Sequence, residues 1–246
     1  MSERFGATNP KALALRFHAQ TGGSTLTAQQ PQNNVVRVAL QGFAAVCGGT
    51  QSLHTNGYDE ALALPSEKSA KIALRTQQVV AHESGAADTV DPFAGSYFIE
   101  SLTDEIEARS SELIAKVDEL GGSVNAIEFI TGEIDESAWG YQERYRLGQD
   151  IVVGVNKFVT DEIDDVEILR VDPEPERRQL ERLKRFKESR DVAAVEARLG
   201  DLKAVARGDG NLLYPIKDAL RDGASIGEVC GAMREVFGEY RGGAFF

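Results

Sequence analysis

The sequence predicts an α/β protein in which strand–helix units are followed by a mainly helical segment. Over residues 1–122, short apolar runs that end in polar, glycine-containing loops alternate with long amphipathic stretches. This alternation is typical of a parallel sheet with crossover helices. From residue 123 to residue 246 strand-like runs become rare and charged stretches become common. We therefore expect two parts, 1–122 and 123–246.

The first strand–helix unit is predicted from a strand over residues 13–19 and the polar loop that follows it. A helix is expected to begin near Asn33 or Asn34, because either side chain can cap a helix N-terminus. Gly48 and Gly49 then end the apolar periodic run, as glycine commonly does at a helix C-terminus.

A second unit repeats this pattern and a third begins after it. The second has a strand and loop over residues 51–57, a cap at Ser66 and a helix that ends near Gly85. The third starts at residues 89–100 and continues into a helix over 103–120, which the following glycine pair ends. One face of that helix collects its apolar residues, which are Ile106, Leu113, Ile114, Val117 and Leu120.

The last part of the chain predicts short strand-like runs at 151–158 and 166–171, then helices at 173–190, 212–220 and 226–240. The helix at 173–190 has an apolar stripe among many charges. A partner-binding helix and a helix that lies on its own domain both fit this pattern, and the second is the commoner case. The stripe consists of Leu180, Leu183 and Phe186.

Composition excludes several classes of function. With 39 acidic and 27 basic residues the net charge is -12, which argues against nucleic acid as a partner, because binding to the phosphate backbone depends on clustered Lys and Arg. No apolar run has the length of a membrane span, and we expect a cytoplasmic protein without a membrane partner. Cys47 and Cys230 stand far apart in apolar stretches, which indicates buried thiols and neither a disulfide framework nor a zinc site.

The loops that follow the first two strands carry the candidate site, since ligands meet parallel α/β sheets at the carboxyl ends of strands. The first loop is rich in uncharged hydrogen-bonding side chains around Gly22 and Gly23, and it suits an amide-decorated or sugar-bearing ligand. Its polar groups could equally satisfy each other and water. In the second loop, Glu60 could accept hydrogen bonds from a diol, or act as a capping or ion-paired residue.

The sequence gives little indication of acid–base catalysis, nucleophilic catalysis or metal binding. His18 and His54 are expected at equivalent ends of neighbouring strands, and two histidines without a third ligand make a weak zinc site. No nucleophile motif or metalloprotease motif occurs in the sequence. We therefore predict no catalytic acid, base or nucleophile and no metal ligand in this chain.

Five runs of sequence resemble the methylmalonyl-CoA mutase family and its acyl-CoA mutase relatives: LRFHAQTGGSTLTAQQP, NNVVRVALQ, GGTQSLHTNGYDEALALP, ALRTQQVVAHESG and DPFAGSYFIESLTDEIE. VGVNKF and EVFGEYR resemble the helical segment that follows the barrel in that family. The resemblance implies the C-terminal portion of a (β/α)8 TIM barrel followed by a helical appendage. The stretch 126–137 and Ser24 depart from the family pattern.

The resemblance also implies adenosylcobalamin as the cofactor. Glu60 and Asn56 would hydrogen-bond the adenosyl ribose, and Gln20 would lie beside the cofactor. Gly23 and Ala63 would line the corrin face. None of these residues would act as a general acid or base.

By the same resemblance the chain would be a component of a mutase that interconverts methylmalonyl-CoA and succinyl-CoA, with isobutyryl-CoA or ethylmalonyl-CoA as alternative substrates. Its partners would be a chain that supplies the N-terminal half of the barrel and a separate cobalamin-binding subunit. An inactive truncated fragment and a non-catalytic assembly subunit are the alternative readings.

Overall fold

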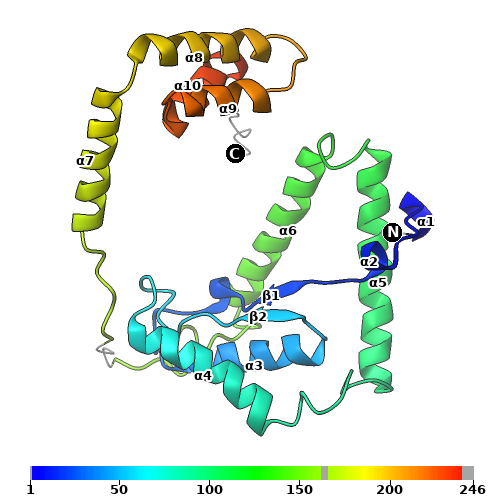
Figure 1. The fold of residues 1–246 in the computed structure, drawn as a ribbon. Helices are drawn as coiled ribbons and strands as arrows, with labels where there is room; N and C mark the ends of the chain where they lie inside the picture. Colours follow the sequence, from blue (N-terminus) through cyan, green and yellow to red (C-terminus); the bar gives the residue numbers. More distant parts are fainter. Residues whose placement is uncertain (1, 162–165, 240–246) are drawn as a thin grey trace. The chain divides into compact units, whose positions relative to one another are not determined.

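The computed structural model describes residues 2–161 and 166–239 and divides into two compact units (Figure 1). The first unit is Met1–Arg170 and the second is Val171–Phe246. The described residues are mostly helical, and one small parallel sheet lies in the first unit. This is an α/β arrangement with a helical C-terminal part. The predicted end of the strand–helix units at residue 122 stays a prediction.

The sheet of the first unit consists of β1 (His18–Gln20) and β2 (Ser52–His54). The strands are parallel, and Gln20 lies opposite His54 at their carboxyl ends. The first strand begins later than the predicted 13–19 and is shorter, because Leu13 ends the short helix α2 (Pro10–Leu13) and residues 14–17 are irregular. Asn9 caps that helix through a side-chain bond to the Lys11 amide, a local signal that competes with extended structure.

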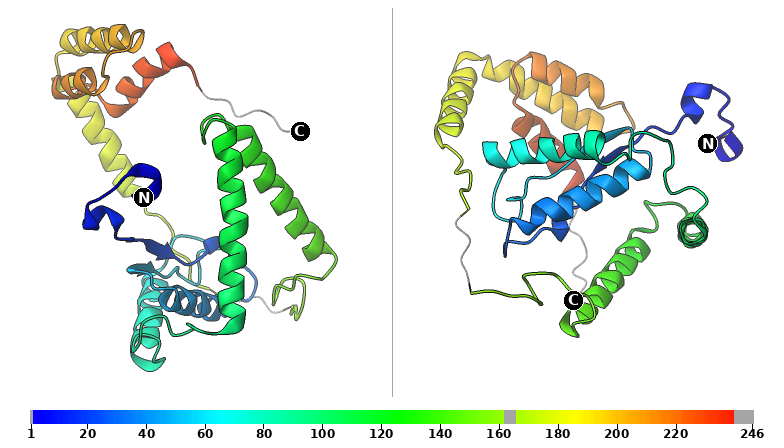
Figure 2. Two further views of the ribbon diagram at one scale, coloured as in Figure 1. Left: turned by 90° about the vertical axis from the view of Figure 1, so that its right-hand side faces the viewer. Right: turned by 90° about the horizontal axis from the view of Figure 1, so that it is seen from below.

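Helices α3 (Asn33–Cys47) and α4 (Glu67–Glu83) pack against each other on one face of the two strands (Figures 1 and 2). Both predicted helices are confirmed. The α4 cap is Ser66, whose side chain accepts the Ser69 amide. Val38, Ala73 and Val80 are among the buried apolar side chains of the two helices.

The third predicted unit is helical only, because residues 89–96 form turns and bends without a strand. Helix α5 (Tyr97–Glu119) begins earlier than predicted and ends as expected at Gly121 and Gly122, which both have φ near +90°. Its apolar face is not covered by the described residues. Val117 is half-buried, and the remaining members are exposed: Ile106, Leu113, Ile114 and Leu120.

The stretch 126–137, which departs from the family pattern, belongs almost entirely to helix α6 (Ile127–Arg146), which has no buried residue and was not predicted. The predicted strand-like runs after it are not strands. Residues 151–158 form turns with one isolated bridge between Val153 and Lys157, and 166–171 are irregular. In the 151–158 segment the Asn156 side chain replaces strand pairing, since it bonds the Val152 amide and the Asp150 carbonyl.

The second unit contains α7 (Glu174–Ser189), α8 (Val192–Ala206), α9 (Leu213–Arg221) and α10 (Ile226–Phe237). Helices α7, α9 and α10 confirm the predicted elements, although the predicted end at Tyr240 lies outside the described residues. Helix α8 was not predicted. Its side chains join those of α9 and α10 in one apolar core, which consists of Val195, Leu202, Ala219, Ala224, Val229 and Ala232.

The apolar stripe of α7 does not pack on the domain as predicted. Leu180 and Phe186 are exposed, and Leu183 is half-buried. Ion pairs within the helix hold its charged face instead, among them Arg177 with Glu174. Pairs of this kind at helical spacing stabilise a helix without any tertiary partner.

An ion pair joins the end of α7 to α10. The Arg190 guanidinium donates to both carboxylate oxygens of Glu228, at 2.7 and 2.5 Å. Glu228 also closes a capping box with Ser225 at the start of α10. Hydrogen bonding from Arg190 holds the pKa of the Glu228 carboxyl well below its usual range, and the bonds from Ser225 add to this shift. The carboxylate therefore stabilises the second unit only while it is ionised.

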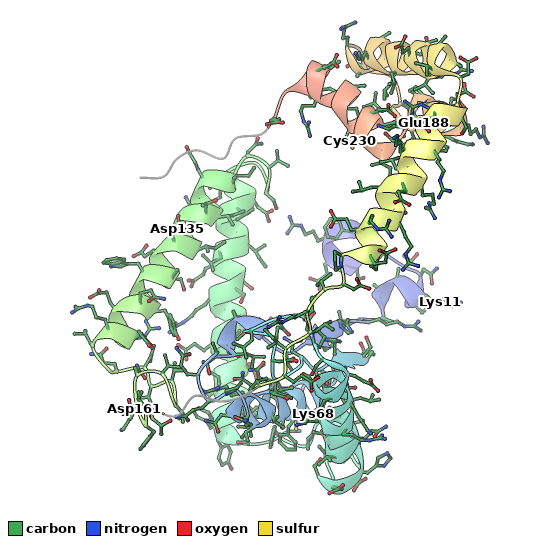
Figure 3. The ribbon with its side chains drawn as sticks, turned by 90° about the vertical axis from the view of Figure 1, so that its left-hand side faces the viewer. Lys11, Lys68, Asp135, Asp161, Glu188 and Cys230 are labelled. Carbon is green, nitrogen blue, oxygen red and sulfur yellow. The ribbon has the colours of Figure 1, made fainter. Side chains whose placement is uncertain are left out.

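The two cysteines differ in burial. Cys47 is buried as predicted, but Cys230 is exposed and the prediction of a buried thiol there is wrong. Cys230 lies on α10 (Figure 3) next to Val229, which faces the core. Consecutive residues of a helix point about 100° apart, so Cys230 falls outside the buried face. Among the described residues, no helix combines the length and the apolar character needed to cross a membrane.

Candidate functional site

The candidate site lies where β1 and β2 end. The loops that follow these strands begin at Thr21 and Thr55, and the two strands run in the same direction. Carboxyl ends of parallel strands meet at one edge of a sheet, so both loops share that edge. A backbone hydrogen bond from the Thr21 amide to the His54 carbonyl joins them directly, at 3.1 Å.

Asn56 connects the two strand ends through its side chain. It is 2% exposed, and its Nδ2 donates to the Thr21 carbonyl at 2.9 Å while its Oδ1 accepts from Gln20 Nε2 at 3.0 Å. The Asn56 amide N–H also donates to Thr21 Oγ1. The predicted site residues Gln20 and Asn56 are therefore in direct contact, and Asn56 orients the exposed Gln20 side chain.

Gly23 and Glu60 approach each other across the two loops. Gly23 opens a short 3-10 helix, η1 (Gly23–Thr25), and a Cβ atom placed on it would lie 2.0 Å from Glu60 Oε1 and 3.2 Å from Asn56 Nδ2. Any side chain at this position would displace the carboxylate, so the close approach requires glycine. Glu60 is exposed, which leaves its carboxylate open to a ligand.

Asp59 fixes the position of the second loop relative to α4. Its carboxylate is fully buried and accepts the Ser66 amide at 2.9 Å and the Ser69 hydroxyl at 2.6 Å. These partners lie at the cap and in the first turn of α4, where the positive end of the helix dipole favours a carboxylate. Asp59 thereby fixes the residue next to Glu60. Asp59 stands among the polar residues of the second loop, and its position before a capped helix is the signal in the sequence that could have identified this supporting role.

Ala63 lies on the turn that follows Glu60. Its amide donates to the Asp59 carbonyl at 3.0 Å, and its side chain is half-buried. Contacts thus group four of the five predicted site residues, Gln20, Gly23, Asn56 and Glu60, while Ala63 borders them along the chain.

Asn34 ties the two loops together from α3 and does not cap that helix. The N-cap is Gln32, without a side-chain bond. The Asn34 side chain is fully buried, with Nδ2 donating to the carbonyls of Thr27 and Tyr58 at 2.9 and 2.8 Å and Oδ1 accepting the Thr27 amide at 3.1 Å. The expectation that Asn34 could be a cap is therefore wrong, because these contacts use its polar atoms elsewhere.

The two histidines are not equivalent. His18 begins β1 opposite Ser52, whereas His54 ends β2 opposite Gln20, so the two lie two residues apart in the register. The His18 ring nitrogen Nδ1 bonds the Ser52 hydroxyl at 2.8 Å. Within residues 2–161 and 166–239 no group of three or more His, Cys, Asp or Glu side chains is arranged to hold a metal ion.

A broad groove of about 1170 Å³ lies beside the first loop. Its lining comes from residues 24–29, one face of α3, the end of α6 and residues 151–155, and it includes apolar side chains such as Val36 and Leu40. Both of these side chains are more than half exposed. The groove therefore adds an apolar surface next to the polar cluster.

Parallel strands that each lead through a polar loop into a helix, with polar groups gathered at the strand ends, define an α/β protein with its site at the carboxyl edge of the sheet. The model of the methylmalonyl-CoA mutase family matches residues 1–239, and the chain belongs to this family.

Individual relatives agree with this assignment. The chain is 44% identical over 245 residues to the 2-hydroxyisobutanoyl-CoA mutase large subunit of Aquincola tertiaricarbonis, which covers 98% of the chain and 44% of the relative. It is 45% identical to mitochondrial methylmalonyl-CoA mutase of Mus musculus over 98% of the chain and 33% of that protein. For methylmalonyl-CoA mutase of Escherichia coli K12 the identity is 44%, over 96% of the chain and 34% of the relative. The chain thus spans less than half the length of these relatives.

Proposed function

We propose that the chain is a component of an adenosylcobalamin-dependent acyl-CoA mutase, an isomerase that rearranges the carbon skeleton of its substrate. The observation that carries the proposal is the pairing of Gly23 with the exposed Glu60 carboxylate at the strand ends. Membership of the methylmalonyl-CoA mutase family supports it.

In this proposal residues 1–122 form the last strand–helix units of a (β/α)8 barrel, and residues 123–246 form the helical segment that follows. Helices α3 and α4 cover one face of the two parallel strands, as the outer helices of a barrel do. Parallel sheets are normally buried on both faces and extend over more than two strands. The strand pair is therefore expected to receive further strands from the rest of the barrel.

The residues at the strand ends suit adenosylcobalamin chemically. The cluster offers amide groups, hydroxyl groups and one carboxylate, and the glycine lets the backbone approach a large flat ligand. The bound cofactor supplies the radical that takes a hydrogen atom from the acyl group, and the protein supplies orientation and shielding. This chain contributes binding groups and no general acid or base.

Each residue has a distinct part in the proposed binding. Glu60 accepts hydrogen bonds from the two ribose hydroxyls, which a carboxylate can do with both oxygens. Asn56 holds Gln20 beside the cofactor through their 3.0 Å bond and contributes its remaining hydrogen-bonding capacity to the ribose. Gly23 and Ala63 give the surface that faces the corrin ring.

We further propose that the chain works with partners in the cytoplasm and is inactive alone. One partner chain completes the N-terminal half of the barrel, and a separate subunit binds cobalamin. One observation supports a multichain enzyme: a relative that is 44% identical to the chain is named a large subunit.

The substrate pair proposed is methylmalonyl-CoA and succinyl-CoA, after the name of the family. Isobutyryl-CoA and ethylmalonyl-CoA are the alternatives. The relative named 2-hydroxyisobutanoyl-CoA mutase adds that thioester to the substrates that an assay needs to include.

The test is purification of the tagged chain with its bound partners, followed by mutase assays on these thioesters with and without adenosylcobalamin. Glu60→Ala should lower turnover about 10- to 100-fold, because it removes hydrogen bonds to a charged acceptor. Glu67→Ala, which removes an exposed carboxylate on α4, is the matched control and should retain full turnover. A partner-bound preparation without cofactor-dependent activity would refute the enzyme assignment, and unchanged turnover in Glu60→Ala would refute the ribose contact.

A further inference from the structure

Gln41 on α3 holds both ends of the turn that carries Gly23. Its Oε1 accepts the Gly22 amide at 2.5 Å, and its Nε2 donates to Thr25 Oγ1 at 2.8 Å. The Thr25 hydroxyl in turn donates to the Gly22 carbonyl at 2.7 Å. These bonds form a closed ring around η1, so the position of the turn depends on the Gln41 side chain.

The same face of α3 fixes the other end of the first loop. Asn34, Val38 and Gln41 follow the spacing i, i+4, i+7, which places them on one side of a helix. Val38 is buried in the core, Asn34 binds the loop at Thr27 and Gln41 binds it at Gly22. A rigid helix thus anchors the loop at two points on either side of Gly23.

Gly23 has little freedom on its other side. A Cβ atom there would lie 2.0 Å from Glu60 Oε1, so the two loops are very close at this point. A shift of the turn by about 1 Å would therefore change the space between the loops that is open to a ligand. Errors of about 1 Å in position are enough to impair a binding site. The ring of bonds around Gln41 leaves the Gly23–Glu60 side untouched. Its effect falls on the position of the binding surface and not on its chemical groups.

We propose that Gln41 is a positioning residue. It sets the distance between Gly23 and the Glu60 carboxylate, and thereby the space that is open to a ligand between the two loops. The identity of the ligand rests on the function proposed above, whereas the positioning of the turn rests on the contacts of this chain alone. Gln41 also lines the groove beside the first loop, and in this role it acts on the Gly23–Glu60 pair through the Gly22–Thr25 turn.

The first experiment measures amide hydrogen exchange at Gly22 in the chain labelled with 15N-glycine. Gln41→Met keeps the length of the side chain and removes both hydrogen bonds, and it should speed exchange at Gly22 about 5- to 10-fold. Gln41→Glu keeps an acceptor for the Gly22 amide and should stay within about twofold of the unsubstituted chain. Gln32→Met is the matched control, since Gln32 is the N-cap of the same helix and makes no side-chain cap bond. Equal exchange at Gly22 in Gln41→Met and the unsubstituted chain would overturn the proposal.

The second experiment measures the dissociation constant of adenosylcobalamin by equilibrium dialysis, with the chain in complex with its partners. Gln41→Met should weaken binding about tenfold, the equivalent of one or two hydrogen bonds, and Gln41→Glu should restore most of the affinity. Faster exchange at Gly22 with unchanged affinity would show a structural contact only and would overturn the positioning role. If the unsubstituted complex binds no adenosylcobalamin, the proposed function fails, and the role of Gln41 in cofactor binding fails with it. The hydrogen exchange at Gly22 still decides whether Gln41 holds the turn.

Discussion

Replacement of Gly23 by alanine tests the geometry of the site most directly. The new Cβ atom would lie 2.0 Å from Glu60 Oε1, about 1.3 Å closer than the shortest ordinary C···O contact of about 3.3 Å. Asn56 Nδ2 would lie 3.2 Å from the same Cβ atom and needs to move by only a few tenths of an ångström. The Glu60 carboxylate, which is exposed at the end of a flexible side chain, therefore has to rotate away.

This substitution should change ligand binding far more than stability. A non-native rotamer of Glu60 costs about 0.5–1.5 kcal/mol. Alanine in place of glycine stabilises by about 0.4–1 kcal/mol through the unfolded chain when the backbone conformation permits it, and Gly23 is not among the glycines with positive φ. The two effects nearly cancel, so the free energy of unfolding should stay within about 1 kcal/mol.

Loss of the Glu60 carboxylate from its position should weaken adenosylcobalamin binding about 10- to 100-fold, the equivalent of one charge-assisted hydrogen bond. Equilibrium dialysis of the partner-bound chain measures this change, and thermal unfolding measures stability. Gly22→Ala is the matched control, because a Cβ atom there would meet its nearest neighbour, Gln41 Oε1, at an ordinary 3.5 Å. The control should bind the cofactor normally.

A double variant separates displacement of Glu60 from other effects of the methyl group. In a Glu60→Ala background the clash is absent, so Gly23→Ala should add less than about twofold to the loss of affinity. If Gly23→Ala binds as tightly as the unsubstituted chain, or if its effect adds in full to that of Glu60→Ala, the reasoning from the Gly23–Glu60 contact is refuted.

Two further substitutions test the support of the site and the second unit. Asn34→Ala should destabilise the chain by about 2–4 kcal/mol in thermal unfolding, because it leaves the buried Tyr58 carbonyl and the half-buried backbone of Thr27 without their partner. A loss no larger than that of the neighbouring, half-buried Asn33→Ala would contradict this. The pKa of Glu228 is lowered in the folded chain, so its contribution to stability is complete above about pH 4.3, the ordinary glutamate pKa, and is lost as the pH falls further. Glu228→Gln should flatten this loss of helical circular dichroism in acid. An unchanged acid dependence in the variant would contradict the role of Glu228.

Helix ends in this chain could be predicted because their signals are local. Ser66 precedes the first turn that it caps, and Gly48 and Gly49 directly follow the last residue of α3. The helices that were missed lack such a clear pattern. Helix α6 contains Gly132 and Gly140 within its span, and glycine inside a periodic run weakens a helix prediction. Helix α8 has apolar residues on most of its sides, so no single stripe identifies it.

The candidate site could be predicted in part. The polar loops after two strands identified its location, and the resemblance to the mutase family supplied Gly23 and Glu60 as members. The roles of the supporting residues depend on tertiary contacts, which the local sequence pattern does not predict. Asn34 bonds a carbonyl 24 residues away, and its sequence context fits a helix cap equally well. Cys230 was misplaced for a similar reason, since an apolar stretch does not tell which face of its helix meets the core.

The hydrogen bonds that build the site join residues no more than 36 positions apart, and several of them span much shorter stretches. Gln41 binds the chain 19 residues before it, and Asn34 binds positions 7 and 24 residues away. Short loops of this kind lose little entropy when they close, and contacts of low sequence separation form early in folding. The strand ends and their loops are therefore expected to take shape while the ribosome is still adding the residues of the second unit, so that a partner would meet a binding edge that is already formed.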